Sequence, residues 1–532
     1  MPHFFPAALE TVFKTWKMSF QSVHFLLFLP VVVGAYFVLP QKLKKTWLLL
    51  ASYYFYLFAA PKYLPVLLAG TGFTYLFGRL LGGAKTARAK KVLLAIGAGG
   101  SLLALCFFKY NGFFAPFVSP LFQKAGLGYQ TGWFTTAAAL GISFYTFAAL
   151  GYLIDVYRGD VPAEKNIIVY ALFLGFFPSV ASGPIPRAGQ LLPQLKTPAA
   201  KFSPKNAANA LCLMAIGFFK KMAVADTLAI FVSAVFKNAE SYSGLTLVCA
   251  VFGFTLQLYF DFSGYTDIAR ATAQLLGLNL AQNFNTPFFA TNFSGFWARW
   301  HISLSSWLQD YIFTPLVWSR WQEKLPFIGK KLQKPPVLSS IAVVFMVSGI
   351  WHGDSIFYVV WGALQVVFRV GEELLHRFWG KPKKNPPLLS RIGKTAVVLV
   401  LWAQSLIFFA VGMLTPGKTL KDALSLFLRQ FTGISLSQTL RDIYAAVYNG
   451  VFSQWYVVAL FLLFSLGCLA LALWADWAQF AKLKGQSLVT GLHRLKKAPR
   501  WALYYLLVLG CFVGFILQSG GFAGANFMYA GY

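Results

Sequence analysis

Two histidines in this chain stand where an imidazole could act as a base. His352 lies in GIWHGDS and His301 lies in ARWHISLS, and each directly follows a tryptophan and has small polar residues nearby. Burial among aromatic residues favours the neutral imidazole, which can accept a proton from a hydroxyl group. The pattern favours general-base chemistry at His352, with His301 in the same site. A structural role for each histidine is the alternative.

The residues beside His352 bear on what it could do. Gly349 and Gly353 flank the Trp351–His352 pair, and glycine lets a backbone or a substrate approach closely. Asp354 could orient the imidazole, but residues two positions apart on a helix do not face each other. The role of Asp354 therefore stays open.

Acidic residues are scarce, so those inside apolar sequence are informative. Asp261 and Asp267 lie in LQLYFDFSGYTDIARATAQLLG, and Asp226 follows a pair of lysines at 220–221. Burying a carboxylate in a membrane is costly, which makes each acid a candidate functional residue. The alternative for each is an internal salt bridge or a helix-end contact, for example between Asp267 and Arg270 at i, i+3.

Several other kinds of site find no support. Two histidines without a convincing third ligand do not indicate a zinc site. The five cysteines lie in apolar runs without a CxxC pair, as small core hydrophobic residues do. There is no GxSxG motif, no P-loop and no GxGxxG motif in a suitable context. Basic residues are scattered between apolar runs, which argues against nucleic-acid binding.

The elements that must position the histidines are membrane helices. The chain of 532 residues is 58% hydrophobic and 12% charged, whereas soluble proteins carry about 25% charged residues. A membrane-spanning helix needs about 20 mostly apolar residues, and many runs approach that length. Spans are expected near residues 23–39, 46–60, 63–82, 91–108, 134–154, 166–182, 208–236, 244–276, 338–350, 355–375, 394–413, 453–475 and 501–518.

The segment 279–336, which contains His301, breaks this pattern. Its many aromatic residues are interrupted by Asn, Ser, Thr, Pro and charged residues. It is too polar for a lipid-facing span and too aromatic for a free loop. An interfacial or buried re-entrant segment is therefore expected.

The net charge of +30 has two explanations: the positive-inside bias of cytoplasmic loops, and attraction to anionic lipid headgroups or an acidic partner. The first predicts that the most basic connectors are cytoplasmic: 41–45, 79–91, 319–334, 376–394 and 481–500. Crossings counted from these connectors place the N-terminus and residues 351–354 toward the outside. They also make 414–450 an external loop, with a short amphipathic helix in KTLKDALSLFLRQF.

Several longer blocks follow one another along the chain. They are MSFQSVHFLLFLPVVVGAYFVLPQKLKKTWLLL, GISFYTFAALGYLIDVYRGD, FFPSVASGPIPRAGQLLPQL, QLYFDFSGYTDIARATAQLLGLNLAQNF and GIWHGDSIFYVVWG. Together they resemble the membrane-bound O-acyltransferase family, and within it the bacterial branch of alginate O-acetylation membrane proteins. The resemblance covers residues 18–532, so we expect a single membrane-bound O-acyltransferase domain there, preceded by an N-terminal extension at residues 1–17.

The resemblance also implies which residues form the site. His352 matches the catalytic histidine of the family, and His301 matches its second active-site position. Substrate-binding or tunnel positions are implied for Trp351, Trp300, Arg299, Ser305, Asp310, Asp261, Asp267 and Arg187.

The implied fold is all-α: a ring of about 11–13 tilted transmembrane helices with re-entrant segments, enclosing a tunnel. The implied activity moves an acyl group, acetyl above all, from a cytoplasmic thioester such as acetyl-CoA to a hydroxyl of a secreted or cell-wall polysaccharide. The transfer is direct or runs through an extracytoplasmic partner transferase. The expected location is the bacterial inner membrane, multi-pass, with no permanently bound cofactor, no metal and no nucleic-acid partner.

Two alternatives remain open. In the first, D-alanine delivered by an acidic acyl carrier protein is passed to teichoic acid, which would suit a basic cytoplasmic face. The second belongs to another class of protein: a transporter or polymer-export channel, with Asp261 and Asp267 along an ion path.

Overall fold

The structure is a computed structural model that describes residues 16–110, 120, 140–198, 201–319, 337–380, 387–451, 454–483 and 487–519. Throughout these ranges the regular elements are helices and no strand occurs, which confirms the all-α prediction. The chain divides into two compact units, which we describe separately. Most of the predicted extension 1–17 lies outside the described residues.

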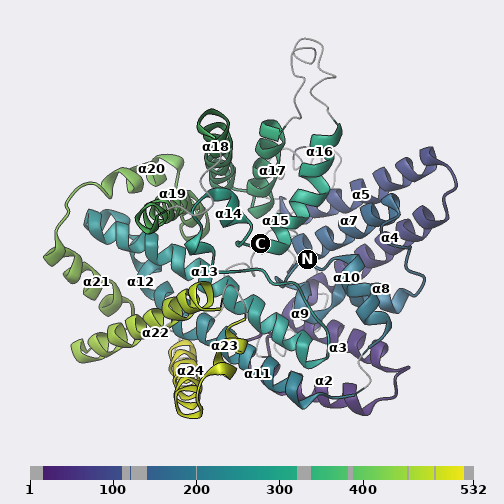
Figure 1. Cartoon of the computed structure of the whole chain (residues 1–532), viewed down its shortest axis with the longest axis horizontal. Helices are drawn as coiled ribbons and strands as arrows, with labels where there is room; N and C mark the ends of the chain where they lie inside the picture. Colours follow the sequence, from purple (N-terminus) through teal and green to yellow (C-terminus); the bar gives the residue numbers. More distant parts are fainter. Residues whose placement is uncertain are drawn as a thin grey trace, which may run out of the picture. The chain divides into compact units, whose positions relative to one another are not determined.

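Unit 1 comprises Met1–Met214 and Tyr265–Gln282. Helices α4, α5 and α7 pack against one another, and α3 packs against α8 (Figure 1). Nearly every residue of α7 is buried, and left-handed glycines, Gly141 and Gly159, stand at its two ends. The helices wholly within this unit are α2 (Val23–Val38), α3 (Lys44–Ala59), η1 (Pro61–Tyr63), α4 (Leu64–Gly83), α5 (Ala87–Lys109), α7 (Ile142–Arg158), α8 (Ile167–Gly175), α9 (Phe177–Val180) and α10 (Ala188–Lys196).

Unit 2 comprises Ala215–Gly264 and Asn283–Met528. Its first helices are η3 (Phe219–Ala225), α12 (Asp226–Lys237), η4 (Ala239–Ser241), η5 (Pro287–Phe289), α14 (Phe293–Trp297), α15 (Ile302–Leu308), η6 (Gln309–Phe313) and α16 (Thr314–Ser319). They are followed by α17 (Val337–His352), α18 (Ile356–Trp379), α19 (Leu388–Leu414), α20 (Leu420–Arg429), α21 (Leu436–Val451), α22 (Trp455–Ala481), α23 (Leu488–Arg494) and α24 (Lys497–Ser519). Both α11 (Pro204–Phe218) and α13 (Gly244–Leu275) contribute residues to each unit.

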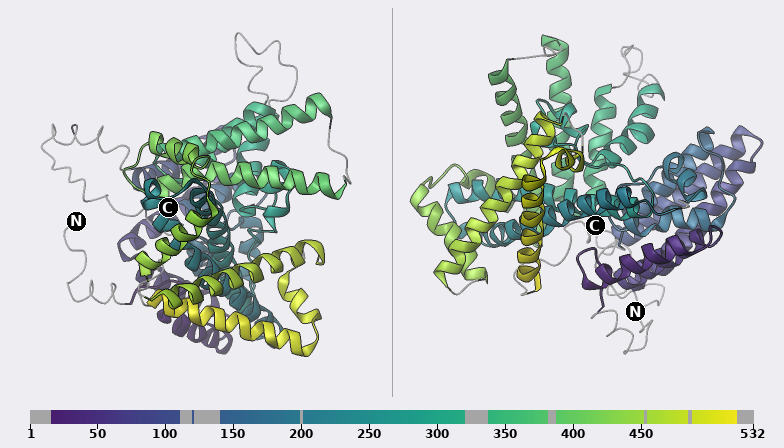
Figure 2. Two further views of the ribbon diagram at one scale, coloured as in Figure 1. Left: turned by 90° about the vertical axis from the view of Figure 1, so that its left-hand side faces the viewer. Right: turned by 60° about the horizontal axis from the view of Figure 1, so that its bottom comes forward.

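The α17–α18 hairpin is the part of unit 2 that positions His352. A Cβ placed on Gly349 would lie 2.5 Å from the carbonyl oxygen of Tyr358, and one on Gly362 would lie 2.8 Å from that of Phe345. Glycine at both positions therefore lets the two helix backbones approach closely. Helix α19 also packs against α18, and the two lie side by side (Figures 1 and 2).

The predicted apolar runs coincide with helices along the whole described chain. Among the described residues, six helices are long and apolar enough to cross a membrane: 61–83, 87–109, 244–275, 388–414, 455–481 and 497–517. Helices α2 and α17 are apolar but shorter. The total number of crossings stays a prediction.

Two segments were predicted not to be membrane spans: 279–336 and the loop 414–450. The described part of 279–336 forms only short helices, η5 to α16, joined by turns. The predicted amphipathic helix in KTLKDALSLFLRQF is present as α20, closed at its start by a capping box of Thr419 and Asp422. Helix α21, which follows it, was not expected from the sequence.

Candidate functional site

His352 is the last residue of α17 and is enclosed by aromatic rings. Its side chain is 5% exposed. Three ring centroids lie close to that of the imidazole: Trp351 and Trp361 at 5.0 Å each, and Phe409 at 5.2 Å. Trp361 comes from α18 and Phe409 from α19, so three helices build this environment.

His301 is equally buried but is held in a different way. It precedes α15 in a left-handed backbone conformation, with φ of 43°, which is unusual for a residue other than glycine. The irregular stretch 283–285 supports this conformation: Asn283 accepts hydrogen bonds from the backbone N–H groups of Ile302 and Ser303, and the N–H of Asn285 donates to the carbonyl of Arg299. Such strain persists where the surrounding structure determines the backbone, and it often marks a functional site.

Trp351 links the two histidines. Its ring centroid lies 6.2 Å from that of His301 and 5.0 Å from that of His352. The His301 ring also meets Phe262 of α13 edge-on, with the two ring centroids 4.7 Å apart. The structure thus brings together three of the residues that the sequence predicted, and it does so within one unit.

Trp300 extends the aromatic cluster away from His301. It is 4% exposed and packs on Phe296 at 5.6 Å and on Trp402 at 5.0 Å. Its carbonyl accepts a hydrogen bond from the Ser305 hydroxyl, so Ser305 helps to fold the turn that carries the Trp–His pair. Nothing in the sequence indicated that Trp402, which lies on a distant helix, would join this cluster.

Asp261 belongs to a buried ion-pair network next to the site. The Lys221 ammonium lies 2.6 Å from Asp261 and 2.5 Å from Asp226, and all three side chains are at most 4% exposed. Lys221 lies in η3, a stretch of π-helix, while Asp261 precedes Phe262 on α13. Two adjacent residues of α13 therefore have different contacts: Asp261 pairs with Lys221, and Phe262 packs against His301.

The remaining predicted residues have other surroundings. Asp267 pairs with Arg270 at 3.3 Å, which is the internal salt bridge weighed as the alternative to a functional role. Asp267 and Arg187 belong to unit 1. Asp310 and Asp354 are exposed, Asp310 on the π-turn η6 and Asp354 on the link after α17.

A large pocket opens on the same unit, beside the segment that carries His301. Its volume is about 1150 Å³. It is lined by four parts of the chain: residues 289–299, the second half of α18, the first half of α19, and Phe480 of α22. Arg299, a predicted site residue, lines this pocket two positions before His301.

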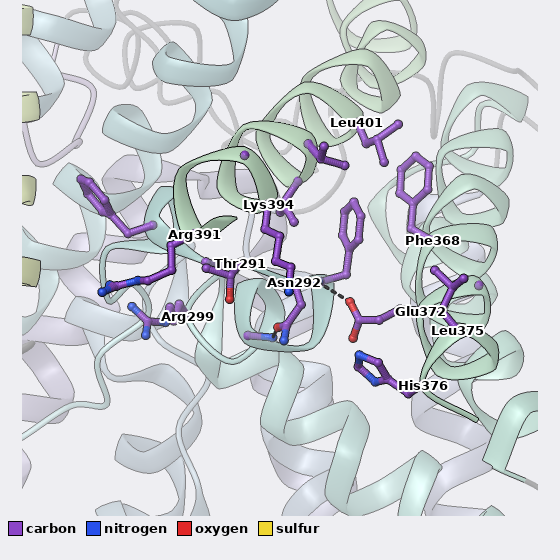
Figure 3. Close-up of a pocket in the computed structure, with 18 of the residues that line it drawn as sticks. Thr291, Asn292, Arg299, Phe368, Glu372, Leu375, His376, Arg391, Lys394 and Leu401 are labelled. Carbon is purple, nitrogen blue, oxygen red and sulfur yellow. Dashed lines mark hydrogen bonds between the residues drawn. The ribbon is translucent and has the colours of Figure 1, made fainter. Parts of the chain in front are cut away.

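The pocket combines apolar walls with cationic groups. Figure 3 shows Arg299 and Arg391 on one side, Glu372 and His376 on the other, and Lys394 between them. Glu372 is already engaged: it accepts hydrogen bonds from the N–H groups of Phe293 and Ser294 and pairs with Arg369. Burial lowers the pKa of the Arg299 guanidinium. A cation with reduced hydration is well suited to binding an anion.

Several of these residues could not be identified from the sequence. Trp361, Phe409 and Trp402 read as ordinary apolar helix positions. Only the packing reveals that Trp361 and Phe409 contact His352, while Trp402 contacts Trp300 and Trp361. Lys394 and Arg391 read as part of a basic connector. Within the described part of the chain, no group of three His, Cys, Asp or Glu side chains could hold a metal ion.

Comparisons with known proteins bear on the family of this chain. The model of the MBOAT, membrane-bound O-acyltransferase, family matches residues 162–409. A probable alginate O-acetylase of Pseudomonas syringae is 35% identical over 351 residues, 65% of this chain and 64% of that protein. The match therefore spans less than two thirds of that relative's length.

Two further relatives act on other polymers, by their names. A peptidoglycan O-acetyltransferase of Helicobacter pylori is 30% identical over 389 residues, 67% of this chain and 71% of that protein. A teichoic acid D-alanyltransferase of Bacillus subtilis is 28% identical over 254 residues, 47% of this chain and 62% of that protein.

Proposed function

This chain belongs to the membrane-bound O-acyltransferase family, and we propose that it is a polysaccharide O-acetyltransferase of a bacterial inner membrane. The acetyl group comes from a cytoplasmic thioester, acetyl-CoA. The acceptor is a hydroxyl of a secreted or cell-wall polysaccharide, reached directly or through an extracytoplasmic partner transferase. The names of the alginate and peptidoglycan relatives support an O-acetyl transfer.

The observation that carries the proposal is the placement of His352. A buried imidazole enclosed by Trp351, Trp361 and Phe409 favours the neutral form, because burial disfavours the charged one. A neutral imidazole can take the proton of an acceptor hydroxyl as that oxygen attacks the thioester carbonyl. The same imidazolium then returns the proton to the departing thiolate.

His301 has a supporting role in this proposal. Its ring reaches the Trp351 ring that also contacts His352, so it lies at the wall of the same site. We assign it to positioning a reacting group or stabilising developing charge. The pocket beside Arg299 is the proposed entrance for acetyl-CoA. Arg299, Arg391 and Lys394 can bind its phosphates, and the apolar walls can accommodate the other parts of the molecule. The basic connector 376–394 at this end is predicted to face the cytoplasm.

The test replaces His352 and measures the acetyl groups themselves. Cells lacking the native gene would express either His352→Ala or, as a control, His493→Ala, whose side chain is exposed on a basic connector. Mild base would release ester-linked acetate from the purified envelope polysaccharide. We expect His352→Ala to lose at least about 10²-fold in acetylation at an equal level of folded protein in the membrane. Normal acetylation by that variant would end the proposal.

A second candidate keeps the chemistry but changes the donor. The similarity to a D-alanyltransferase favours D-alanine delivered by an acidic carrier protein, which a chain of net charge +30 could attract. Isolated membranes supplied with radiolabelled acetyl-CoA, or with the D-alanyl carrier protein, would separate the two. Label that enters the polymer only from the carrier would replace the first candidate by the second.

A further inference from the structure

Among the rings that enclose His352, that of Trp361 carries a buried hydrogen-bond donor without an acceptor in the described part of the chain. Phe409 has no polar atom. The Trp361 side chain is 2% exposed, and its indole N–H is buried with no acceptor among the residues that the structure describes. Its ring centroid lies 5.0 Å from that of His352, nearly perpendicular to it.

A buried donor without an acceptor is unfavourable, and native proteins rarely keep one without a reason. The packing around Trp361 does not require an N–H at all. Its contacts with His352, Phe409 and Trp402 are ring contacts that a phenyl group could also make. Apolar packing therefore does not explain why an indole, and not a phenyl ring, stands at position 361.

The position of the donor suits one reacting atom in particular. A general base must lie within hydrogen-bond reach of the attacking hydroxyl, about 2.6–3.2 Å, and the attacked carbonyl carbon lies about 3 Å beyond that oxygen. The carbonyl oxygen of the acyl group thus falls within reach of side chains that contact the imidazole. This oxygen gains negative charge as the hydroxyl oxygen bonds to the carbon.

We propose that the indole N–H of Trp361 donates a hydrogen bond to the acyl carbonyl oxygen and stabilises it as the oxyanion of acyl transfer. The assignment rests on the proposed function. The hydroxyl oxygen forms the new C–O bond, His352 takes its proton, the C–S bond breaks, and the proton passes to the thiolate. Trp361 transfers no proton and only holds the oxygen on which the charge develops.

Trp402 provides a matched comparison. It is 1% exposed, and its indole N–H also lacks an acceptor within the described ranges. Its ring lies 6.1 Å from that of Trp361 and 5.0 Å from that of Trp300, one ring further from His352. A loss caused by the oxyanion contact should therefore be much larger at Trp361 than at Trp402.

The neighbouring Gln365 indicates that the facing sides of α18 and α19 are organised around polar groups. Gln365 lies one helical turn after Trp361 and is fully buried. Its amide nitrogen donates to the Ser405 hydroxyl at 2.9 Å, and that hydroxyl donates to the Trp402 carbonyl at 2.7 Å. The first of these bonds ties α18 to α19 one helical turn from Trp361.

The experiment compares Trp361→Phe with Trp402→Phe and with Trp474→Phe, a half-exposed tryptophan on α22. The full-length protein in lipid nanodiscs would be supplied with acetyl-CoA and with de-O-acetylated envelope polysaccharide as the acceptor, and the released thiol would be followed. We expect Trp361→Phe to lower kcat by about 10²-fold with KM changed little. The other two variants should stay within a few-fold of the parent.

The second readout is the melting temperature of the unliganded protein. Because Trp361→Phe removes a donor that lacks an acceptor and keeps a ring, its melting temperature should not fall in proportion to its activity. Replacing Trp361 by benzothienylalanine, which has the shape of tryptophan but no N–H, should reproduce the kcat loss if the phenyl variant folds poorly. Full kcat in that variant, or equal losses in the Trp361 and Trp402 variants, would overturn the proposal.

The failure of this inference and the failure of the proposed function have different signatures. Polymer acetylation in cells expressing His352→Ala tests the proposed acetyl transfer itself. Acetylation abolished in His352→Ala but retained in Trp361→Phe would refute the oxyanion contact alone. Acetylation retained in His352→Ala would refute both the proposed function and the oxyanion contact.

Discussion

The ring of His301 lies edge-on to the ring of Trp351, with the two centroids 6.2 Å apart, and Trp351 directly precedes His352 at the end of α17. A residue from the irregular segment 283–301 and a residue from an apolar helix thus meet at one aromatic side chain. This contact turns two separate Trp–His sequences into one candidate site.

The first prediction concerns His301. Asparagine tolerates the left-handed backbone conformation seen there, so His301→Asn should keep the fold while removing the imidazole. We expect acetyl transfer to fall by about 10²-fold, as for loss of a group acting on the reacting atoms. Polymer-bound acetate measures the effect.

Thr286 offers a matched control for that variant. It is also buried in a left-handed conformation, with φ of 48°, and it belongs to the same segment. A β-branched residue is strained there, so Thr286→Asn should keep its activity and melt no earlier than the parent. Equal losses of activity in both variants would mean that the backbone, and not the imidazole, is what matters.

The second prediction concerns Glu372, which joins α18 to the start of α14 through the N–H groups of Phe293 and Ser294. Glu372→Ala removes a helix cap and should destabilise the protein by roughly 1–2 kcal/mol. Because α14 leads to Arg299 and His301, activity should fall as well. Thermal melting and acetyl transfer report the two effects.

The adjacent Glu373 serves as the control. It pairs with Arg377 at 3.3 Å, with both side chains about a third exposed or more, 32% and 41%. Such a surface pair contributes little, so Glu373→Ala should change stability by less than about 1 kcal/mol. Indistinguishable melting curves for the two variants would contradict the role given to Glu372.

The third prediction concerns the cations of the pocket. Arg391→Ala or Lys394→Ala should each raise KM for acetyl-CoA by about 10-fold, because a charge-assisted hydrogen bond is lost, while kcat changes little. Acetyl-dephospho-CoA, which lacks one phosphate, should be affected less by whichever residue holds that phosphate. Arg377→Ala is the control, since Arg377 does not line the pocket. Unchanged KM values in both pocket variants would show that this pocket does not bind acetyl-CoA.

The fourth prediction concerns Lys221. Lys221→Met leaves Asp226 and Asp261 buried without their cation, and breaking a buried pair in this way costs roughly 3–5 kcal/mol. We expect a large drop in melting temperature or loss of folded protein in detergent. Lys237→Met, at an exposed position near the end of α12, should stay within about 0.5 kcal/mol of the parent. A Lys221→Met protein that melts like the parent would show that the carboxylates do not depend on this ammonium.

Local sequence was sufficient for features that local geometry controls. The apolar runs predicted the helices because a helix in a membrane satisfies its own backbone, whatever lies beside it. The Asp267–Arg270 pair was foreseen as an alternative because residues three apart lie on one helix face. The segment 279–336 was also predictable from local sequence, because its polar and proline residues do not permit one long apolar helix.

The chain by itself determined which residues are able to do the chemistry: two histidines after tryptophans, few acids, and basic connectors. Only the tertiary structure decided what surrounds them. Trp361 and Phe409 reach His352 from two other helices, Lys221 meets Asp261 from a distant π-turn, and Arg299 shares a pocket with Lys394. These contacts depend on how helices pack, and neither local propensity nor periodicity specifies which faces of remote helices meet.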